Sequence, residues 1–170
     1  YNVFDTANNQ YTTEDRILTI DATFPLIDWG NLVLSDGQNK SQSNIYMNVS
    51  ITEINFQNIT FNVNNVRQTY TTRTYDYNKT GLANGTYYYN VTVCDTLNNC
   101  NITSTRQITL DTGLPSATLL SPANDSVTAN ASLNFTVSLT DNLGIKNATL
   151  FIYNSSGVYN QTTVTYAPST

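Results

Sequence analysis

Two cysteines are the residues of this chain whose type and spacing most directly suggest chemistry. Cys94 and Cys100 flank a short polar segment, and two such thiols form a disulfide in an oxidising compartment. The alternatives are two free thiols or half of a metal site. A structural zinc site needs four ligands, and the chain has no His. We therefore expect a disulfide between Cys94 and Cys100 that stabilises a hairpin by about 2 kcal/mol.

Asn-x-Ser/Thr triplets, in which x is not Pro, are acceptors for N-linked glycans. They include 13 of the 25 Asn residues, whereas random order in this Ser- and Thr-rich chain would give roughly 6. The candidate sites are Asn39, Asn48, Asn58, Asn78, Asn84, Asn90, Asn101, Asn124, Asn130, Asn134, Asn147, Asn154 and Asn160. Asn48, Asn90 and Asn134 alternate with apolar residues, so glycans there would face solvent, although a polar Asn faces outward in any case. We expect several of these sites to carry covalent N-glycans.

Other chemistry has little support in the sequence. Without His, the chain has no His-based triad, and no phosphate-binding Gly pattern is present. Glu14 and Glu53 belong to different units and form no evident acid–base pair. Asp residues recur at turns, which could bind Ca²⁺, but without EF-hand or DxDxD spacing we favour Asx turns and linker contacts. These residues are Asp5, Asp21, Asp36, Asp95, Asp111, Asp125 and Asp141. We expect no catalytic, cofactor-binding or metal site.

The segment that positions the cysteines occurs twice. Residues 86–110 are predicted to form a closing hairpin, and residues 1–20 repeat it 90 positions earlier. The matching pairs include Val3 and Val93, Asp5 and Asp95, Asn9 and Asn99, Thr13 and Thr103, Arg16 and Arg106, Asp21 and Asp111, and Pro25 and Pro115. Phe4 and Gln10 replace both cysteines in the first copy, which supports their acting as a pair. In that copy, Tyr1, Val3, Leu18 and Ile20 are predicted to face inward on two strands.

The 90-residue period predicts a tandem array of β-sandwich units. Residues 1–22 supply the final two strands of one unit, residues 23–112 a complete unit of about seven strands, and residues 113–170 the first strands of another. The alternation of Ile45, Met47, Val49 and Ile51 predicts a strand with one buried face. Its repeat in the last unit is Leu133, Phe135, Val137 and Leu139. No helical period is present, so the fold class is all-β.

One long segment also resembles a known family. NGTYYYNVTVCDTLNNCNITSTRQITLDTGLP, followed by LLSPANDSVTANASLNFTVSLTDNLGIKNATLFIYN, is similar to the tandem immunoglobulin-like modules of large archaeal surface proteins, and bacterial adhesins and extracellular filaments use similar modules. The resemblance implies an extracellular or cell-surface protein, often glycosylated, with a structural or adhesive role. Gly85-Thr86-Tyr87 is similar to the tyrosine corner of these sandwiches, with Ala83 where Asp is usual.

Composition narrows the partners. Charged residues make up 11% of the chain, which has a net charge of −5. The chain has no cluster of basic residues that could bind nucleic acid. No apolar stretch of about 18 residues suggests a membrane span in this segment. We expect partners to be other copies or neighbouring immunoglobulin-like domains in a linear filament or stalk.

Two explanations account for the first hairpin. The simpler one, which the lack of an initiator Met favours, is a longer array. The other is a polymer in which the hairpin of one chain completes the open unit of the next by strand complementation. The alternative functions are an adhesin-type module that binds glycans or another cell surface, and an accessory domain of a secreted enzyme. Five tyrosines expected to be exposed could stack on sugars or on neighbouring subunits, although such residues are more often cross-strand pairs. They are Tyr70, Tyr75, Tyr77, Tyr88 and Tyr153.

Overall fold

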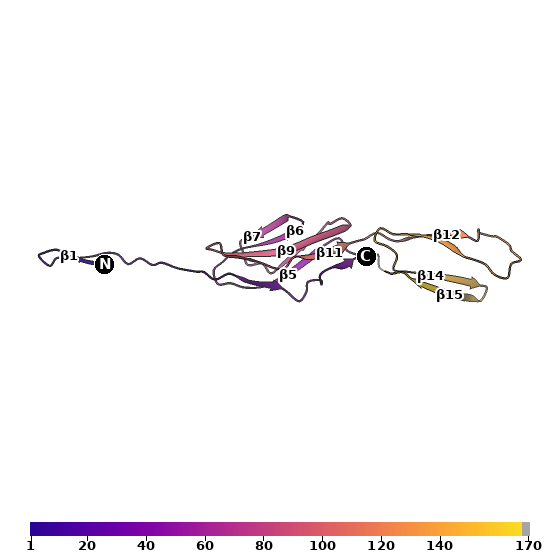
Figure 1. The fold of residues 1–170 in the computed structure, drawn as a ribbon, viewed down its shortest axis with the longest axis horizontal. Helices are drawn as coiled ribbons and strands as arrows, with labels where there is room; N and C mark the ends of the chain where they lie inside the picture. Colours follow the sequence, from indigo (N-terminus) through magenta and orange to yellow (C-terminus); the bar gives the residue numbers. More distant parts are fainter. Residues whose placement is uncertain (168–170) are drawn as a thin grey trace.

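The computed structural model describes residues 1–167, and within that range every regular element is a β-strand. The molecule is elongated (Figure 1). A small hairpin lies at one end on an extended linker, a sandwich occupies the middle, and a pair of two-stranded ribbons follows. The predicted all-β class is therefore confirmed.

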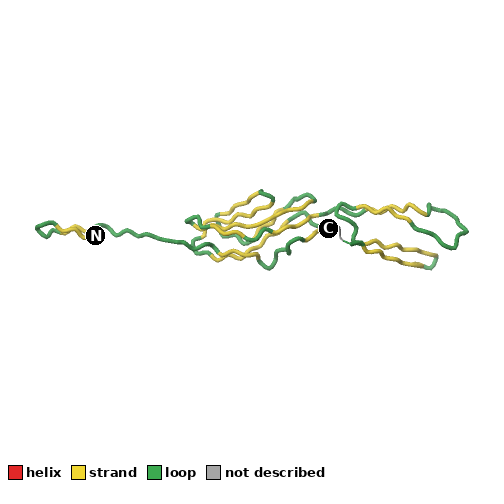
Figure 2. Tube along the Cα trace, viewed as in Figure 1, coloured by secondary structure: helices red, strands yellow, loops and turns green. Residues whose placement is uncertain are grey.

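The central unit is a sandwich of two sheets (Figure 2). The smaller sheet has the order β3-β5-β8, with β3 at Leu26–Trp29, β5 at Ile45–Thr52 and β8 at Asp76–Lys79. The larger has the order β4-β11-β9-β6-β7, with β10 also paired to β9. Its strands are β4 (Gln38–Lys40), β6 (Phe56–Val63), β7 (Val66–Tyr70), β9 (Gly85–Asp95), β10 (Cys100–Ile102) and β11 (Arg106–Leu110).

The core forms where the inward-facing residues of the two sheets meet. Its buried residues, all at most 3% exposed, are Ile45, Met47, Val49, Ile59, Phe61, Val63, Tyr89, Val91, Val93, Ile108 and Leu110. Trp29 closes one side, with its ring 5.4 Å from that of Tyr89 in an edge-on contact. The guanidinium of Arg106 lies 4.9 Å from the centre of the Trp29 ring. The period-2 alternation in the sequence thus identified the core strands.

The central unit has nine strands, β3 to β11, where about seven were expected. One reason is that the Thr- and Tyr-rich stretch after β6 splits between the sheets: β7 pairs with β6, and β8 pairs with β5. Arg73 lies in the connection between them. Its guanidinium donates a hydrogen bond to the backbone oxygen of Glu53 and lies 5.3 Å from the centre of the Phe56 ring. Arg73 therefore fixes the position at which the chain crosses from one sheet to the other.

The tyrosine corner forms in this unit. The Tyr87 hydroxyl donates a hydrogen bond to the backbone oxygen of Ala83 at 3.0 Å. The acceptor is a main-chain carbonyl, so the contact does not need the Asp that is usual at this position.

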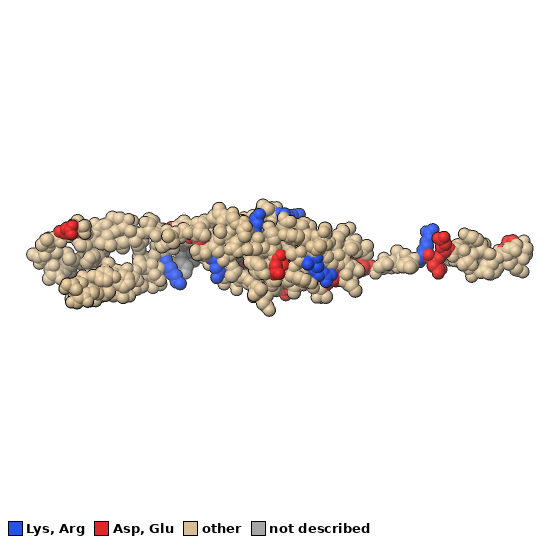
Figure 3. Space-filling view, turned by 180° about the vertical axis from the view of Figure 1, so that it is seen from behind, with Lys and Arg blue, Asp and Glu red and all other residues tan. Residues whose placement is uncertain are grey.

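The C-terminal unit consists of two separate ribbons. Strand β12 (Ser116–Ser121) pairs with β13 (Thr136–Thr140), and β14 (Asn147–Asn154) pairs with β15 (Gly157–Thr165). The β12–β13 register repeats that of β3–β5, because Ala117 opposes Leu139 as Ile27 opposes Ile51. Among residues 113–167 no strand joins the two ribbons, and Figure 3 shows an opening between them.

The N-terminal hairpin corrects one expectation. Strand β1 (Asn2–Phe4) pairs with β2 (Gln10–Thr12), but Val3, Leu18 and Ile20 face solvent and do not face inward as predicted. The strand expected around Leu18 and Ile20 is also absent, since residues 13–25 form an extended segment. The physical reason is that the hairpin lies away from the other sheets, so no neighbouring strand covers its apolar side chains.

Candidate binding and modification surfaces

The closing hairpin of the central unit carries the disulfide that the sequence predicted. Cys94 and Cys100 are directly opposed residues of β9 and β10, with their Cα atoms 4.1 Å apart, and their sulfurs are bonded. The disulfide therefore joins the two strands at the base of the turn.

A buried carboxylate organises that turn. Asp95 is fully buried, and its Oδ1 accepts hydrogen bonds from the backbone nitrogens of Leu97 at 2.9 Å and Asn99 at 2.8 Å. Its Oδ2 accepts one from Asn99 Nδ2 at 2.7 Å. Three donors offset much of the cost of removing the carboxylate from water. Asn98 takes the left-handed conformation, with φ of 66°, which Asn tolerates.

The same turn forms in the N-terminal hairpin without a disulfide. Asp5 Oδ1 accepts hydrogen bonds from the backbone nitrogens of Ala7 and Asn9, each at 2.8 Å, and Asp5 Oδ2 accepts one from Asn9 Nδ2 at 2.7 Å. Asn8 has a φ of 66°. The bonds from Asn9 lower the pKa of the Asp5 carboxyl. This turn is therefore built by its own residues.

The strands that flank the two turns are joined by matching hydrogen bonds. The Val91 nitrogen donates to Thr103 Oγ1 at 3.0 Å, and the Tyr1 nitrogen donates to Thr13 Oγ1 at 2.7 Å. In return, the nitrogens of Thr103 and Thr13 donate to the oxygens of Val91 and Tyr1, each at 2.9 Å. Residues 1–13 thus have the geometry that their counterparts have inside an intact sandwich.

The first linker is attached to the unit that follows it through a carboxylate. Asp21 accepts hydrogen bonds from Thr23 Oγ1 at 2.5 Å and from Asn55 Nδ2 at 2.7 Å. These bonds, that from Thr23 first, hold the pKa of the Asp21 carboxyl below its ordinary value. The linker is therefore fixed to the loop that follows β5.

The second linker repeats this joint. Asp111 Oδ1 accepts hydrogen bonds from the backbone nitrogen of Gly113 at 2.8 Å, from Asn142 Nδ2 at 3.0 Å and from Asn84 Nδ2 at 2.9 Å. Asn142 follows β13, the counterpart of β5, as Asn55 follows β5. Asp111 therefore contacts both the unit before it and the unit after it.

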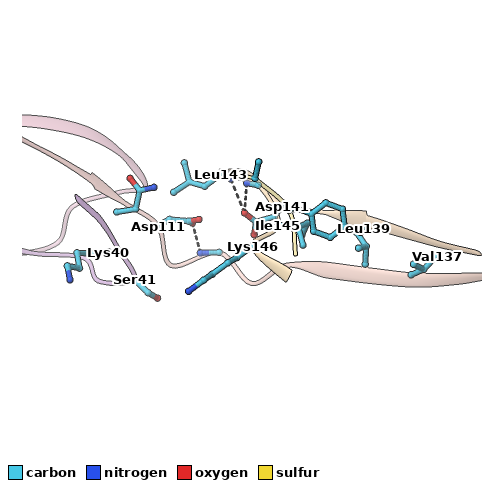
Figure 4. Close-up of a pocket in the computed structure, with 14 residues that line it drawn as sticks. Lys40, Ser41, Asp111, Val137, Leu139, Asp141, Leu143, Ile145 and Lys146 are labelled. Atoms are coloured by element: carbon cyan, nitrogen blue, oxygen red, sulfur yellow. Dashed lines mark hydrogen bonds between the residues drawn. The ribbon is translucent and has the colours of Figure 1, made fainter. Parts of the chain in front are cut away.

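An open cleft of about 860 Å³ lies at the second joint (Figure 4). Lys40 lies on its central side and Leu139 on its C-terminal side. Asp141 Oδ1 accepts hydrogen bonds from the backbone nitrogens of Leu143 and Gly144, each at 2.9 Å, so this carboxylate makes the expected Asx turn. Within the described part of the chain, no three His, Cys, Asp or Glu side chains cluster as metal ligands would.

The sequons divide into two groups by exposure. Those with an exposed Asn are Asn39, Asn78, Asn84, Asn124, Asn130, Asn134, Asn147, Asn154 and Asn160. The half-buried ones are Asn48, Asn58, Asn90 and Asn101. In this second group, each Nδ2 donates a hydrogen bond, to Asp76 at 2.6 Å, Gln57 at 3.2 Å, Thr105 at 2.9 Å and the Pro25 oxygen at 3.0 Å respectively.

This division changes the expectation for two sites. Asn48 and Asn90 alternate out of phase with the core, as predicted, but neighbouring side chains cover them. A Cβ atom at Gly30 would lie 1.7 Å from Asn48 Oδ1, which shows how closely the backbone approaches that side chain. The alternation along a strand shows on which face of the sheet a residue lies, but it does not show which side chains surround that residue. The sequence therefore could not predict that Asn48 and Asn90 are covered.

A polar groove that sequence reasoning missed lies on the outer face of the larger sheet. Its lining residues are Asn62, Asn64, Asn65, Thr86, Tyr88, Asn90 and Thr105. Asn62 Nδ2 donates to Asn90 Oδ1 at 3.1 Å, while Asn62 Oδ1 is buried and has no hydrogen-bond partner among the described residues. The sequence signal that could have indicated this groove is that Asn62 and Asn90 each lie between core residues, on two strands that are adjacent in the sheet.

The tyrosines expected on the surface differ in their environment. Tyr75, Tyr88 and Tyr153 are exposed. Tyr70 and Tyr77 are half buried, with ring centres 6.1 Å and 5.3 Å from that of Phe61. For these two the expectation of exposure was wrong, because they close the edge of the core.

No protein-family model and no curated protein matches this chain. Among solved structures, it is similar to the fibronectin(III)-like modules of Clostridium thermocellum CbhA, with 15% identity and a TM-score of 0.46 over 84% of this chain and 75% of that one. It is also similar to dimeric latent PorU from Porphyromonas gingivalis, with 15% identity and a TM-score of 0.44 over 96% of this chain. The match spans 18% of the PorU chain. No helix in residues 1–167 is long and apolar enough to cross a membrane.

Proposed function

We propose that this chain is part of an extracellular, N-glycosylated structural protein, in which tandem immunoglobulin-like sandwiches form a filament or cell-surface stalk. The proposal assigns it no catalysis and no bound cofactor. Its partners are neighbouring sandwich units and other copies of itself.

The repeated linker joint is the observation that carries this proposal. Asp21 accepts a hydrogen bond from Asn55, and Asp111 accepts one from Asn142, so each linker carboxylate is attached to the unit that follows. Because a carboxylate attaches each linker to the unit that follows, successive units would be regularly spaced along one axis, as a stalk requires. The elongated arrangement in Figure 1 agrees with this use.

Two further features support the extracellular setting. The Cys94–Cys100 disulfide is of a kind that persists in oxidising compartments. Nine of the sequons have an exposed Asn, in a chain with 11% charged residues. Glycans on those sites would hydrate a surface with few charges, which Figure 3 shows as widely spaced patches of colour.

Glycopeptide mass spectrometry of native material tests the proposal. We expect modification at exposed sites such as Asn134 and Asn154, and much lower occupancy at Asn48 and Asn90, which are half buried and whose amides bond neighbouring side chains. Unmodified Asn at all thirteen sequons would overturn the glycoprotein assignment. Electron microscopy of the same material would show filaments or stalks, and dispersed globular particles would count against the structural role.

The polar groove favours a second candidate function, adhesion through glycan binding. Tyr88 is 53% exposed and could stack on a sugar ring, and the amide and hydroxyl side chains that line the groove are donors and acceptors for sugar hydroxyls. A glycan array with the wild-type chain and a Tyr88→Ala variant distinguishes the two functions. Binding that Tyr88→Ala abolishes would support the adhesin, and the absence of any binding would leave the structural role as the assignment.

A further inference from the structure

We propose that strand β7 of the central sandwich is a docking edge for a second copy of the chain, whose own β7 pairs with it in the antiparallel direction. This inference rests on the proposed function, because it names a lateral contact between two stalks. The edge belongs to the central unit, whose two sheets enclose a continuous core.

Strand β7 forms one edge of the larger sheet. It pairs with β6, and in the described part of the chain no strand pairs with its other side (Figure 1). All of its residues except Tyr70 are exposed. The β6–β7 register has no bulge, and β7 contains no Pro and only one charged residue, Arg67. Bulges, prolines and charges usually keep a free edge from pairing, so β7 is open to another strand.

Two other edges of the central sandwich carry sequons, and β7 does not. The opposite edge of the larger sheet is β4, which contains the exposed sequon residue Asn39. One edge of the smaller sheet is β8, which contains the exposed sequon residue Asn78. Glycans on these residues would cover both edges and keep other chains from pairing there. Glycosylation would therefore leave β7 accessible.

The backbone of β7 presents the groups that strand pairing needs. The two Asn residues of the β6–β7 turn have φ of 46° and 67°, as in the two-residue turns of tight hairpins. In such a hairpin the residues that flank the turn, here Val63 and Val66, form a hydrogen-bonded pair. The direction of the backbone groups alternates along a strand, so Arg67 and Thr69 direct their N–H and C=O groups to the free edge.

The side chains of β7 are complementary to themselves when Gln68 lies opposite Gln68 of the second copy. Arg67 of each copy then opposes Thr69 of the other, and their outward backbone groups meet as hydrogen-bonded pairs. Val66, which is 60% exposed, opposes Tyr70 and packs on its ring. The two Gln68 amides can each donate and accept. Centring the pair on Arg67 would instead oppose two like charges, which is unfavourable.

The partner is a second copy because the residue pattern of β7 fits itself. Identical strands that pair antiparallel are related by a two-fold axis, so the contact closes as a dimer. The strands of the central sandwich run roughly along the length of the chain (Figure 1). Two paired chains would therefore lie side by side in opposite directions, as stalks do when they extend from facing surfaces and meet.

Two substitutions of Thr69 test the pairing. Thr69→Glu places an opposite charge across from Arg67 of the second copy, and Thr69→Lys places a like charge there. Both variants lose the same 2.8 Å hydrogen bond with Thr60, so each controls for the other. In sedimentation equilibrium, the wild type should exceed the monomer mass as concentration rises, and the dissociation constant of Thr69→Lys should be at least about tenfold above that of Thr69→Glu. A wild type that stays monomeric, or equal constants for the two variants, would overturn the proposal.

Disulfide trapping tests the register. The two Gln68 Cα atoms would lie about 4.5 Å apart, within disulfide range, so Gln68→Cys should form a covalent dimer. Thr69→Cys is the matched control, because the two copies of this residue would lie diagonally, about 7–8 Å apart, and it should give at least about tenfold less dimer. Equal or reversed yields would refute this register. Failure of both experiments would leave the glycosylated stalk untouched, because that assignment rests on native glycopeptides and microscopy.

Discussion

The carboxylate of Asp5 accepts two hydrogen bonds from Asn9, one from its backbone nitrogen at 2.8 Å and one from Nδ2 at 2.7 Å. Asp95 accepts the same two bonds from Asn99 at the same distances. Asp5 is exposed and Asp95 is fully buried, so the surroundings do not create this turn. The local sequence therefore specifies this turn in both copies.

Replacement of Asp95 by Asn should destabilise the central unit. The buried Asp95 carboxylate accepts three hydrogen bonds. In Asp95→Asn the NH₂ group of the new amide would face these donors, so the free energy of unfolding should fall by about 1–3 kcal/mol. Denaturant unfolding followed by the fluorescence of Trp29, the only Trp in the chain, reports on this unit alone. Asp5→Asn is the matched control and should leave that transition unchanged, and equal effects of the two variants would contradict the assignment.

Removal of the disulfide should weaken the same unit by a similar amount. The double variant Cys94→Ser and Cys100→Ser should lower the free energy of unfolding by about 2 kcal/mol, because the cross-link closes a short loop in the unfolded chain. Reducing agent should produce the same loss in the wild type and none in the double variant. A wild-type transition that reducing agent does not move would contradict this estimate.

The tyrosine corner can be tested by removing one hydroxyl. Tyr87→Phe removes the donor to the Ala83 oxygen and should cost about 1 kcal/mol by the same fluorescence measurement. Tyr88→Phe provides the control, because this neighbouring side chain points to the exposed outer face. The corner would be a minor contact if both variants unfolded like the wild type.

The first linker joint should respond to acid. Hydrogen bonds from Thr23 and Asn55 lower the pKa of Asp21 in the folded chain, so the joint contributes stability above the ordinary Asp pKa of about 3.9 and loses it as the pH falls through the lowered value. NMR titration should show the Thr23 amide shift with a midpoint below that of an unperturbed Asp. Asp21→Asn should remove this transition, and an ordinary midpoint in the wild type would show that the joint is open in solution.

Period and phase in the sequence were sufficient to predict much of the fold. The alternation around Met47 and around Val91 identified core strands, and the loss of both cysteines in the first copy identified the disulfide. These features are local, or follow from comparing two copies of the same segment.

Features that depend on contacts between distant strands could not be predicted. The split of the Thr- and Tyr-rich stretch between two sheets involves Arg73 and its contacts with Glu53 and Phe56. Burial of the Asn48 amide depends on Asp76 across the sheet. The Asn62–Asn90 pair required the register of β6 against β9, which no local pattern contains.

Small-angle X-ray scattering of the chain tests the central claim, that each linker is fixed to the unit that follows it, most directly. Asp21 and Asp111 each accept a hydrogen bond from the following unit, so the wild type should show an extended shape with a narrow distribution of lengths. Asp111→Ala removes the acceptor at the second joint and should broaden that distribution. A wild type whose distribution is as broad as that of Asp111→Ala would contradict the account.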